Sequence, residues 1–550
     1  MTLRRPLVSV EALLSAAVLY LFLACNGAFW RAALNGLGWN AAGTWVFALS
    51  LLGIGGGLYF VFLSPLATRW SVRPLLGLLF LVSAAASYYT ERYAIFIDRT
   101  MVANVLATHY TEARELITPS MVGHILLYGA LPAALLWWPR LKARPVLRAA
   151  GVRLVWTVGA ALLAVGCLML VFADFASLMR NHREVRYLVT PGNVVAATVA
   201  NAFGRVRRTG PLLPVGEDAR LSAAWQQRSR PTLFVLVVGE TARAQNFSLN
   251  GYERQTNPEL TRRDVINFPR VRACGTSTEV SLPCMFSPFG RRQYDEDRIQ
   301  THQSLLHVLA RAGFDVLWRD NQSGCKGVCE GLPQHDLAAS RIEGLCSGGQ
   351  CRDEVLLHDF DSVLRDARGN LFVVLHQLGS HGPAYFRRYP PAFKRFQPAC
   401  ESEDLQRCTT AEIRNAYDNS LLYTDHVLGR LIDYLAARQD RFDTAMLYVS
   451  DHGESLGENG MYLHGMPYAI APDVQLRVPM VAWMSPGFGR SFGVDTACLR
   501  ARAGRELSHD NLFHSMLGLM DVSTTVYDRS MDMFADCRAP SATLPATAAR

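Results

Sequence analysis

The feature that most constrains the fold is the uneven distribution of apolar residues. Half of the 550 residues are hydrophobic; they are concentrated before about residue 176, and most charged residues follow that point. A membrane-spanning helix needs about 20 predominantly apolar residues. Five segments approach or reach this length: about Val10–Trp30, Thr44–Leu66, Pro74–Tyr89, Met121–Trp138 and Leu154–Phe175. We therefore predict a transmembrane domain with five helices over residues 1–178, followed by a soluble part.

The basic residues predict how these helices are oriented. Arg and Lys precede the first segment and occupy the loops between the second and third and between the fourth and fifth: Arg4, Arg5, Arg69, Arg73, Arg140, Lys142, Arg144, Arg148 and Arg153. Short cytoplasmic loops carry such an excess. The N-terminus is then cytoplasmic, and five crossings place everything after Phe175 on the outer face. The first segment is too long for the apolar region of a signal peptide, and four more spans follow it.

The net charge of +8 suggests two classes of partner. One is nucleic acid, but the basic residues are scattered and the apolar first third already places the chain in a membrane, so we expect none. The other is the anionic membrane surface, to which basic residues are attracted. A transporter with a large exported domain is a further alternative. It predicts ionisable residues facing inward within the spans, and no such set is evident.

The outer loop between the third and fourth spans, Glu91 to Ser120, carries a polar pattern. Asn104, Thr108 and Glu112 recur at every fourth position, which would place them on one face of a helix. This is either a solvated helix face or a polar lining for a lipid head group at the membrane surface.

The exported part divides into a bridge, a domain and a tail. Residues 179–230 carry several Pro and Gly residues and are predicted to bridge. From Pro231 short apolar runs alternate with helical stretches, which favours an α/β domain with a mostly parallel sheet over residues 231–538. The predicted strands are Leu233–Val238, Val316–Trp318, Leu371–Leu375, Met446–Val449 and Val478–Trp483, and the predicted helices are about Thr301–Ala312, Asp353–Arg368 and Ala411–Ala436. Residues 539–550 are predicted to be a disordered tail.

Cysteine usage agrees with export. Ten of the twelve cysteines lie in the outer part, and eight form close pairs: Cys274 and Cys284, Cys325 and Cys329, Cys346 and Cys351, and Cys400 and Cys408. In an oxidising compartment such pairs indicate local disulfides. Cysteine zinc sites are the alternative, but the pairs lack a consistent C-x₂-C framework. Cys498 and Cys537 could form a fifth bridge.

Polar residues follow several predicted strands. Glu240 follows one, His376 and His381 follow another, and Asp451 and His452 follow a third. Open α/β sheets keep their sites at the carboxyl ends of strands. Glu240, Asp451 and His452 make a plausible set of three ligands that leaves a fourth zinc position open. The alternative for the Asp-His-Gly sequence is a simple turn at Gly453.

A nucleophile is expected in the segment C-G-T-S-T-E-V-S-L-P-C, residues 274–284. Coordination to zinc would activate a hydroxyl there. The residues alone leave Thr276, Ser277, Thr278 and Ser281 open, as well as an inert turn. His381, His464 and Lys326 are further candidates to bind or protonate a phosphoryl group.

At these residues the chain resembles the lipid A phosphoethanolamine transferases, a family that includes the mobile colistin resistance enzymes. The resemblance covers essentially the whole chain. It is carried by G-E-T-A-R-A-Q-N-F-S-L-N-G-Y, C-G-T-S-T-E-V-S-L-P-C-M-F-S, W-R-D-N-Q-S-G-C-K-G-V-C, G-S-H-G-P and S-D-H-G-E-S-L-G-E-N-G-M-Y-L-H-G. It implies five spans in a bacterial inner membrane and a periplasmic domain of the sulfatase and alkaline phosphatase type.

The resemblance also implies roles for individual residues. Glu240, Asp451 and His452 match the zinc ligands, and Thr278 matches the nucleophile, which also contacts zinc. The substrate or second-metal site would comprise His381, His464 and Lys326, and the lipid would be held by Asn104, Thr108 and Glu112. The four close cysteine pairs match the family's disulfides. Glu279 departs from the pattern, because relatives often carry a smaller residue there, which could alter how the acceptor fits.

The implied reaction is transfer of phosphoethanolamine from phosphatidylethanolamine to a phosphate of lipid A through a phosphoethanolamine-threonine intermediate, by an enzyme expected to act as a monomer. The added group would weaken the binding of polymyxin and other cationic peptides to the bacterial surface and so confer resistance to them. An acceptor in the core heptose or another periplasmic glycan is the alternative. A sulfatase would need a C/S-x-P-x-R motif, which is absent, and the motifs G-E-T-A-R and C-K-G-V-C argue against a glycerol-phosphate transferase.

Overall fold

A computed structural model describes residues 5–108, 110–207, 210–366 and 369–539. Two compact units are present. The smaller contains the described residues up to 102 together with residues 117–202, and the larger contains 103–116 and the described residues from 203 onward. The predicted tail, residues 539–550, lies outside the described residues except for Ala539.

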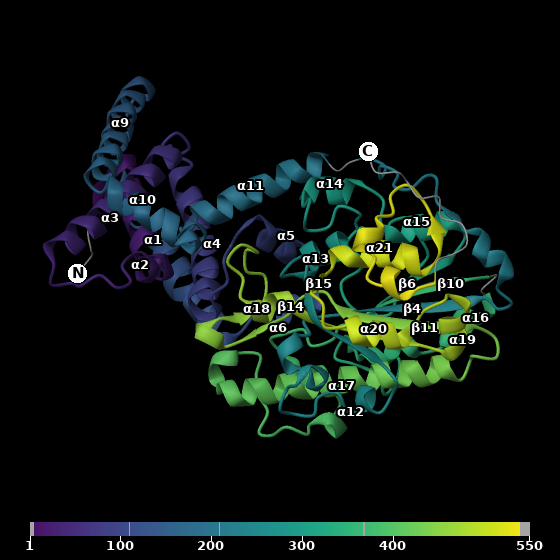
Figure 1. The fold of residues 1–550 in the computed structure, drawn as a ribbon. Coiled ribbons are helices and arrows are strands. Elements are labelled where there is room, and N and C mark those ends of the chain that lie inside the picture. The colour runs from purple at the N-terminus through teal and green to yellow at the C-terminus, as the bar shows by residue number, and fades with distance from the viewer. Residues whose placement is uncertain (1–4, 109, 208–209, 367–368, 540–550) are drawn as a thin grey trace. The chain divides into compact units, whose positions relative to one another are not determined.

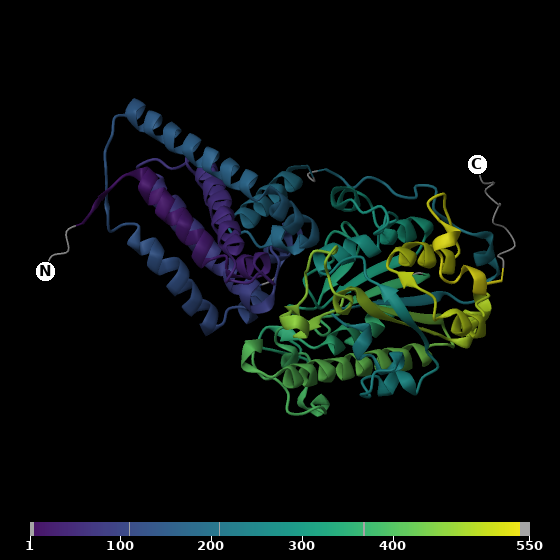
Figure 2. The same cartoon turned by 60° about the vertical axis from the view of Figure 1, so that its left-hand side comes forward.

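The smaller unit consists of helices. Its long members are α1 (Val10–Ala24), α3 (Ala42–Leu63), α4 (Val72–Tyr93) and α9 (Val146–Leu170), and Figure 2 shows them side by side in purple and blue. Small residues allow close packing: a Cβ atom added to Gly57 of α3 would lie 2.7 Å from the carbonyl oxygen of Ala160 in α9. Helices pack this closely in membranes because no hydrophobic effect drives them together there, so van der Waals contact must.

All five segments predicted to span are helical, but their length and composition do not establish five spans. Among the described residues, α3, α4 and α9 are each long and apolar enough to cross a membrane, and α1 with α2 (Gly27–Ala33), bent by 64°, gives a fourth if the pair counts as one. The remaining segment, Pro119–Leu135, is shorter. It is divided into α7 (Pro119–Ile125), a π-helical turn (Leu126–Ala130) and α8 (Leu131–Leu135), with Pro132 at the start of α8.

The continuous helix predicted through Asn104, Thr108 and Glu112 is wrong. Helix α5 (Arg99–Ala107) ends before Thr108, and a second helix, α6 (Tyr110–Glu115), begins two residues later. The hydroxyl of Thr108 donates a 2.7 Å hydrogen bond to the carbonyl oxygen of Asn104. Because the helix is broken, spacing of four residues no longer places these side chains on one face. The side chain of Glu112 lies outside the described part of the structure.

The larger unit is built on an eight-stranded sheet of order β15-β5-β14-β11-β4-β10-β6-β7. The strands are β15 (Leu507–Ser508), β5 (Ile266–Arg272), β14 (Arg477–Met484), β11 (Asp443–Ser450), β4 (Thr232–Gly239), β10 (Leu371–His376), β6 (Asp315–Asp320) and β7 (Gln334–Asp336). Strands β11, β4, β10, β6 and β7 run parallel, whereas β14 is antiparallel to both of its neighbours. The sheet is therefore mixed, and the prediction of a mostly parallel sheet describes its central strands.

All five predicted strands are present as β4, β6, β10, β11 and β14. Residues of β4, β10 and β11 are buried throughout, as expected of strands covered on both faces. The sequence analysis missed β5, which contains Pro269 and three polar or charged positions that alternate with its buried residues. A proline within such a run argues against a central strand, and β5 indeed lies near the edge of the sheet.

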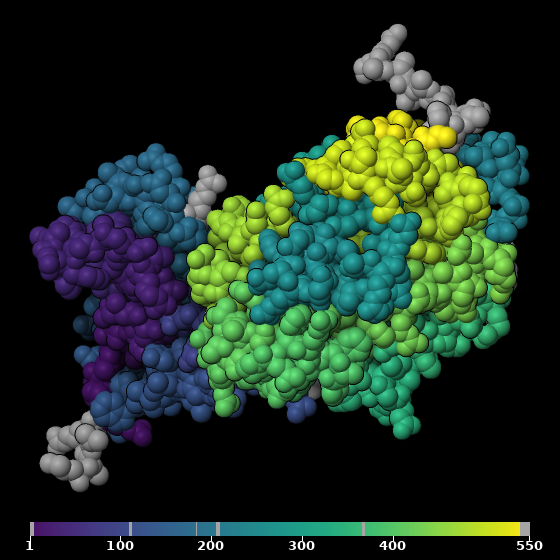
Figure 3. All heavy atoms as spheres, turned by 60° about the horizontal axis from the view of Figure 1, so that its bottom comes forward, coloured from purple at the N-terminus to yellow at the C-terminus, as the bar shows by residue number. Residues whose placement is uncertain are grey.

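Helices cover both faces of this sheet (Figure 1). Helix α17 (Thr410–Ala436) lies along one face, and α15 (Leu305–Ala312) and α21 (Asp510–Leu519) lie on the other. The carboxylate of Asp425 in α17 accepts hydrogen bonds from the backbone N–H groups of Glu259 and Leu260 in α12 (Pro258–Thr261). Figure 3 turns this face toward the viewer and shows the teal atoms around α12 beside the green atoms of α17.

The structure reproduces the three helices predicted in the larger unit to different degrees. The one at Ala411–Ala436 is confirmed as α17, whose N-terminus carries a capping box of Thr409 and Glu412. The one at Thr301–Ala312 begins only at Leu305, because Ser304 caps α15 there. The one at Asp353–Arg368 is split into a 3₁₀ turn, Asp353–Leu357, and α16, Phe360–Asp366, with Asp359 between them at φ +48°.

Candidate active site

The site lies where three neighbouring parallel strands end. Strand β4 is flanked by β11 and β10, and Val238 pairs with both Val449 and His376. Glu240 follows the last residue of β4, and Asp451 follows the last residue of β11. Because strand register aligns these ends, the two carboxylates meet at one edge of the sheet, the place where open α/β sheets bind ligands.

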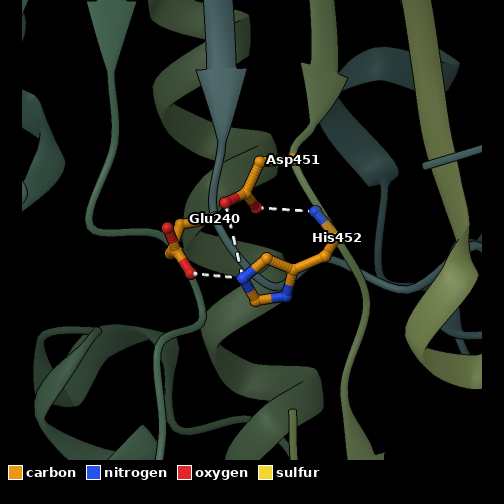
Figure 4. Close-up of side chains that lie close together, drawn as sticks. All are labelled: Glu240, Asp451 and His452. Carbon is orange, nitrogen blue, oxygen red and sulfur yellow. Dashed lines mark hydrogen bonds and ion pairs between the residues drawn. The ribbon is translucent and has the colours of Figure 1, made fainter. Parts of the chain in front are cut away.

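Glu240, Asp451 and His452 form a cluster that we call the metal triad. One ligand atom from each lies within 4.8 Å of the others. The Nε2 of His452 is 3.3 Å from Oε1 of Glu240 and 3.4 Å from Oδ2 of Asp451 (Figure 4). All three side chains are buried, and neither of those two carboxylate oxygens has a hydrogen-bond partner among the described residues. Buried oxygens without donors suit a bound cation.

The charges of the metal triad act strongly on one another because all three side chains are buried. Burial, and then the charge of Asp451, raises the pKa of Glu240 to about 7. Burial acts to lower the pKa of His452, but Asp451 and Glu240 outweigh it and raise that pKa to about 10. Both shifts show that the buried carboxylates favour positive charge at this place. Two carboxylates and one imidazole nitrogen fit a divalent metal ion such as zinc.

The hydroxyl of Thr278 lies against the metal triad. Thr278 is the first residue of α13 (Thr278–Met285), and its Oγ1 donates a 2.9 Å hydrogen bond to Oε2 of Glu240 and lies 3.4 Å from Nε2 of His452. Two other candidates point elsewhere: the hydroxyl of Thr276 donates to the carbonyl oxygen of Met466, and that of Ser281 donates to the carbonyl oxygen of Asp451. The geometry therefore favours Thr278 among the hydroxyls that the sequence left open.

Five disulfides are formed in the larger unit. They are the four predicted close pairs and the fifth pair, Cys498–Cys537. The bond between Cys274 and Cys284 closes the segment that carries Thr278. Cys25 and Cys167, in the predicted spans, are free thiols.

Replacing Cys274 and Cys284 together by Ser is expected to lower both stability and activity. Opening a short loop costs about 2–4 kcal/mol of unfolding free energy, and here the loop also positions Thr278. Thermal unfolding and the initial rate of the catalysed reaction are the measurements. The matched control is Cys498→Ser with Cys537→Ser, a bridge with a longer separation of 39 residues. It should lower stability at least as much without changing the rate of the folded protein. Equal losses of rate in both variants would contradict a positioning role for the first bridge.

Two of the histidines predicted from the sequence, His464 and His381, lie next to one another near the metal triad. The rings of His452 and His464 have centroids 4.4 Å apart, and those of His464 and His381 are 5.5 Å apart. Burial, and then the charge of His452, lowers the pKa of His464 well below its usual value. A neutral imidazole in this place is able to bind a second cation or accept a proton.

Glu454 is a site residue that sequence reasoning missed. It is fully buried; its Oε2 lies 2.9 Å from Nδ1 of His464, and its Oε1 accepts a 2.9 Å hydrogen bond from the hydroxyl of Tyr385. This contact leaves Nε2 of His464 available on the other side of the ring. The available signal was an acidic residue two positions after His452 in a segment already chosen for its ligands.

Asp320 was also missed. It ends β6, and its Oδ1 accepts a 2.7 Å hydrogen bond from Nδ1 of His376, the last residue of β10. Burial acts to raise the pKa of Asp320, but His376 and hydrogen bonds from Trp318 and Gly324 outweigh it and lower the pKa to about 2. The position of Asp320 at another strand end would have supported its inclusion.

The remaining predicted residues are less closely connected to the metal triad. Lys326 is almost buried, and its Nζ lies 3.7 Å from the carboxylate of Glu279, the residue that follows Thr278. Among the described residues, no hydrogen bond or ion pair joins Asn104 or Thr108 to the metal triad. Their proposed role with the lipid stays a prediction.

Comparison with known proteins gives two family matches. A profile described as "Phosphoethanolamine transferase EptA/EptB" matches residues 57–204, and one described as "Sulfatase" matches residues 232–522. The phosphoethanolamine transferase EptA of Escherichia coli K12 is 40% identical over 538 residues, 98% of each chain. The phosphatidylethanolamine transferase Mcr-1 of E. coli is 37% identical over 476 residues, covering 84% of this chain and 86% of the relative.

One solved structure covers almost the whole chain. It is the integral membrane lipooligosaccharide phosphoethanolamine transferase A from Neisseria meningitidis, with a TM-score of 0.93 and 40% identity, covering 97% of this chain and 100% of the other. The similarity therefore extends over both units.

Proposed function

The chain belongs to the phosphoethanolamine transferase family of EptA and Mcr, and from this we propose that it transfers phosphoethanolamine from phosphatidylethanolamine to a phosphate of lipid A. The observation that carries the proposal is the hydroxyl of Thr278, 2.9 Å from a carboxylate of the metal triad. A transferase with a covalent step needs a nucleophile whose proton has an acceptor, and this contact supplies both.

In the first half-reaction, Oγ of Thr278 attacks the phosphorus of phosphatidylethanolamine. The bond from phosphorus to the diacylglycerol oxygen breaks, and diacylglycerol leaves as an alcohol. Glu240 is placed to accept the proton of the hydroxyl. The leaving oxygen needs the proton that Glu240 accepts, and His464, a neutral imidazole whose ring lies 4.4 Å from that of His452, is placed to relay it there.

In the second half-reaction, an oxygen of a lipid A phosphate attacks the same phosphorus, and the bond from phosphorus to Oγ of Thr278 breaks. The proton of the attacking phosphate hydroxyl passes to Thr278, which leaves as a hydroxyl. We assign His381 and Lys326 to binding the transferred phosphoryl group, because both are cationic or donor groups beside the nucleophile segment or the metal triad. Asn104, Thr108 and Glu112 are assigned to the lipid substrate.

We propose Zn²⁺ as the metal, held by Glu240, Asp451, His452 and Thr278, with a second ion during turnover at His381 and His464. Zn²⁺ takes carboxylate and imidazole ligands in open catalytic sites. When bound it would stabilise negative charge on the phosphoryl oxygens and favour ionisation of the threonine hydroxyl.

The proposed setting is a bacterial inner membrane. We propose five crossings over residues 1–178 with a cytoplasmic N-terminus, a bridging segment over 179–230, and a catalytic domain over 231–538 in the periplasm, acting as a monomer. The membrane domain would confine the enzyme and both lipids to one surface, which raises their effective concentration. Amines added to lipid A would reduce its negative charge and confer resistance to polymyxin and other cationic peptides.

Mass spectrometry of lipid A tests this function. Lipid A from cells that express the protein should carry an added phosphoethanolamine, and lipid A from cells without it should not. If lipid A is unchanged while core heptose or another periplasmic glycan gains the group, the acceptor assignment is wrong and the transfer chemistry stands. If no glycan or lipid gains it from folded protein, the transferase assignment fails.

A further inference from the structure

A buried ion pair ties helix α6 to the loop that carries His381. In the sequence, α6 lies between the membrane segments α4 and α7, yet residues 103–116 group by their contacts with the larger unit. Glu115, at the end of α6, and Arg388 have side chains that are 2% and 1% exposed. An acidic residue of an outer loop would ordinarily face water, so its burial calls for an explanation.

Every side-chain nitrogen and oxygen atom of this pair takes part in a hydrogen bond. Oε2 of Glu115 accepts a 2.5 Å hydrogen bond from Nη2 of Arg388, and its Oε1 accepts one of 2.9 Å from Nε2 of Gln350. Nη1 of Arg388 donates to Oε1 of the same glutamine at 2.8 Å. The three side chains thus form a closed network, in which a buried charge pair is tolerated because its lone pairs and protons are satisfied.

The third donor of Arg388 reaches the active-site loop. Its Nε donates a 2.7 Å hydrogen bond to the backbone carbonyl oxygen of His381. The ring of His381 lies 5.5 Å from that of His464, which in turn lies 4.4 Å from that of His452. One guanidinium group therefore holds both α6 and the backbone of a residue beside the metal triad.

We propose that Glu115 and Arg388 are positioning residues that latch residues 103–116 to the catalytic unit, so that this outer-loop segment works as part of the active site. The segment carries Asn104 and Thr108. Arg388 fixes the position of this segment relative to the backbone of His381. This deepens the proposed function and rests on it, because the segment matters to the reaction only if it helps to hold the lipid donor.

A purely structural pair is the competing explanation, and substrate choice separates the two. Loss of the latch should impair use of a donor embedded in a bilayer, which needs residues 103–116, more than use of a soluble phosphoethanolamine ester, which needs only the nucleophile and the metal triad. A pair that only stabilises the fold would affect both donors alike.

The test uses the full-length protein carrying Glu115→Gln, which keeps the shape of the side chain and removes its charge. Hydrogen exchange of the backbone amides of residues 110–116 should become faster. The KM for phosphatidylethanolamine in vesicles should rise about tenfold or more, because a buried guanidinium is left without its counter-charge, while turnover of the soluble ester stays within about twofold of wild type.

Two further variants complete the design. Glu401→Gln is the matched control, because Glu401 forms an ion pair with Lys394 and, among the described residues, none with Glu115, Arg387 or Arg388; it should change neither exchange nor KM. Arg388→Lys should impair both donors, since it releases the carbonyl oxygen of His381 as well as Glu115. If Glu115→Gln does not accumulate as folded protein, Gln350→Ala, which removes only the bridging amide, gives the same comparison.

Unchanged exchange in Glu115→Gln overturns the latch, whatever the activity. Faster exchange with equal losses on both donors, or with no loss on either, overturns its positioning role. If wild-type protein itself transfers nothing from phosphatidylethanolamine, the proposed function fails, and the exchange result alone decides whether the latch exists.

Discussion

Thr278→Ala is expected to reduce transfer of phosphoethanolamine at least about a thousandfold, because it removes the only covalent acceptor in the reaction. The hydroxyl that is lost lies 2.9 Å from Glu240 and 3.4 Å from Nε2 of His452. The substitution deletes few atoms at the first position of α13, so the stability cost should be only about 1 kcal/mol. Mass spectrometry of lipid A, with thermal unfolding in parallel, makes the measurement.

Neighbouring hydroxyls provide the controls for this variant. Thr278→Ser keeps a hydroxyl on the same carbon and should retain measurable transfer. Thr276→Val removes a hydroxyl that is bonded to the carbonyl oxygen of Met466 and should lower stability more than activity. Intact-protein mass after incubation with donor alone should show an added phosphoethanolamine on wild type and none on Thr278→Ala. Full transfer by Thr278→Ala would show that the nucleophile is misassigned.

Removal of the metal is expected to abolish transfer and to destabilise the larger unit. Two carboxylates, Glu240 and Asp451, are buried together, and each carries an oxygen that has no hydrogen-bond partner in the described part of the chain. A ligand present at about a thousand times its Kd contributes about 4 kcal/mol to stability, so a chelator should lower the Tm of a unit of this size by roughly 5 °C. Thermal unfolding before and after chelation, with the metal content measured, tests this.

Added Zn²⁺ should restore both Tm and activity after chelation. Glu240→Gln is the control, because a variant that cannot hold the metal should unfold at the same temperature with and without the chelator. The metal assignment is contradicted if chelated protein, shown to be metal-free, keeps its Tm and its rate of transfer.

Strand ends explain why much of the site was predictable. A buried parallel strand is a nearly continuous apolar run, so β4, β10 and β11 are visible in the sequence, and the first polar residues after β4 and β11 are Glu240 and Asp451. Strand β5, which lies next to the edge strand β15, and the break after Ala107 were not predictable in this way. Each depends on neighbours that are distant in sequence, which periodicity does not report.

The choice of nucleophile shows where sequence reasoning stops. Four hydroxyl residues between positions 276 and 281 have the same local chemistry. Three of them differ in what the fold places opposite the hydroxyl: a carbonyl oxygen for Thr276 and Ser281, and Glu240 for Thr278. Glu454 and Asp320 were missed for the same reason, since a carboxylate that orients a histidine is recognisable only beside that histidine.

The sequence by itself determined an apolar helical first part, an α/β domain after it, and the strand ends that carry Glu240, Asp451 and His452, because apolar length, alternation of strands and helices, and residue type are local properties of a chain. The tertiary structure alone decided which hydroxyl meets the metal triad, how β14 and β5 extend the sheet, and that Glu115 is buried against Arg388. These are contacts between residues separated by tens to hundreds of positions. Their energies depend on burial and distance, which the order of residues does not contain.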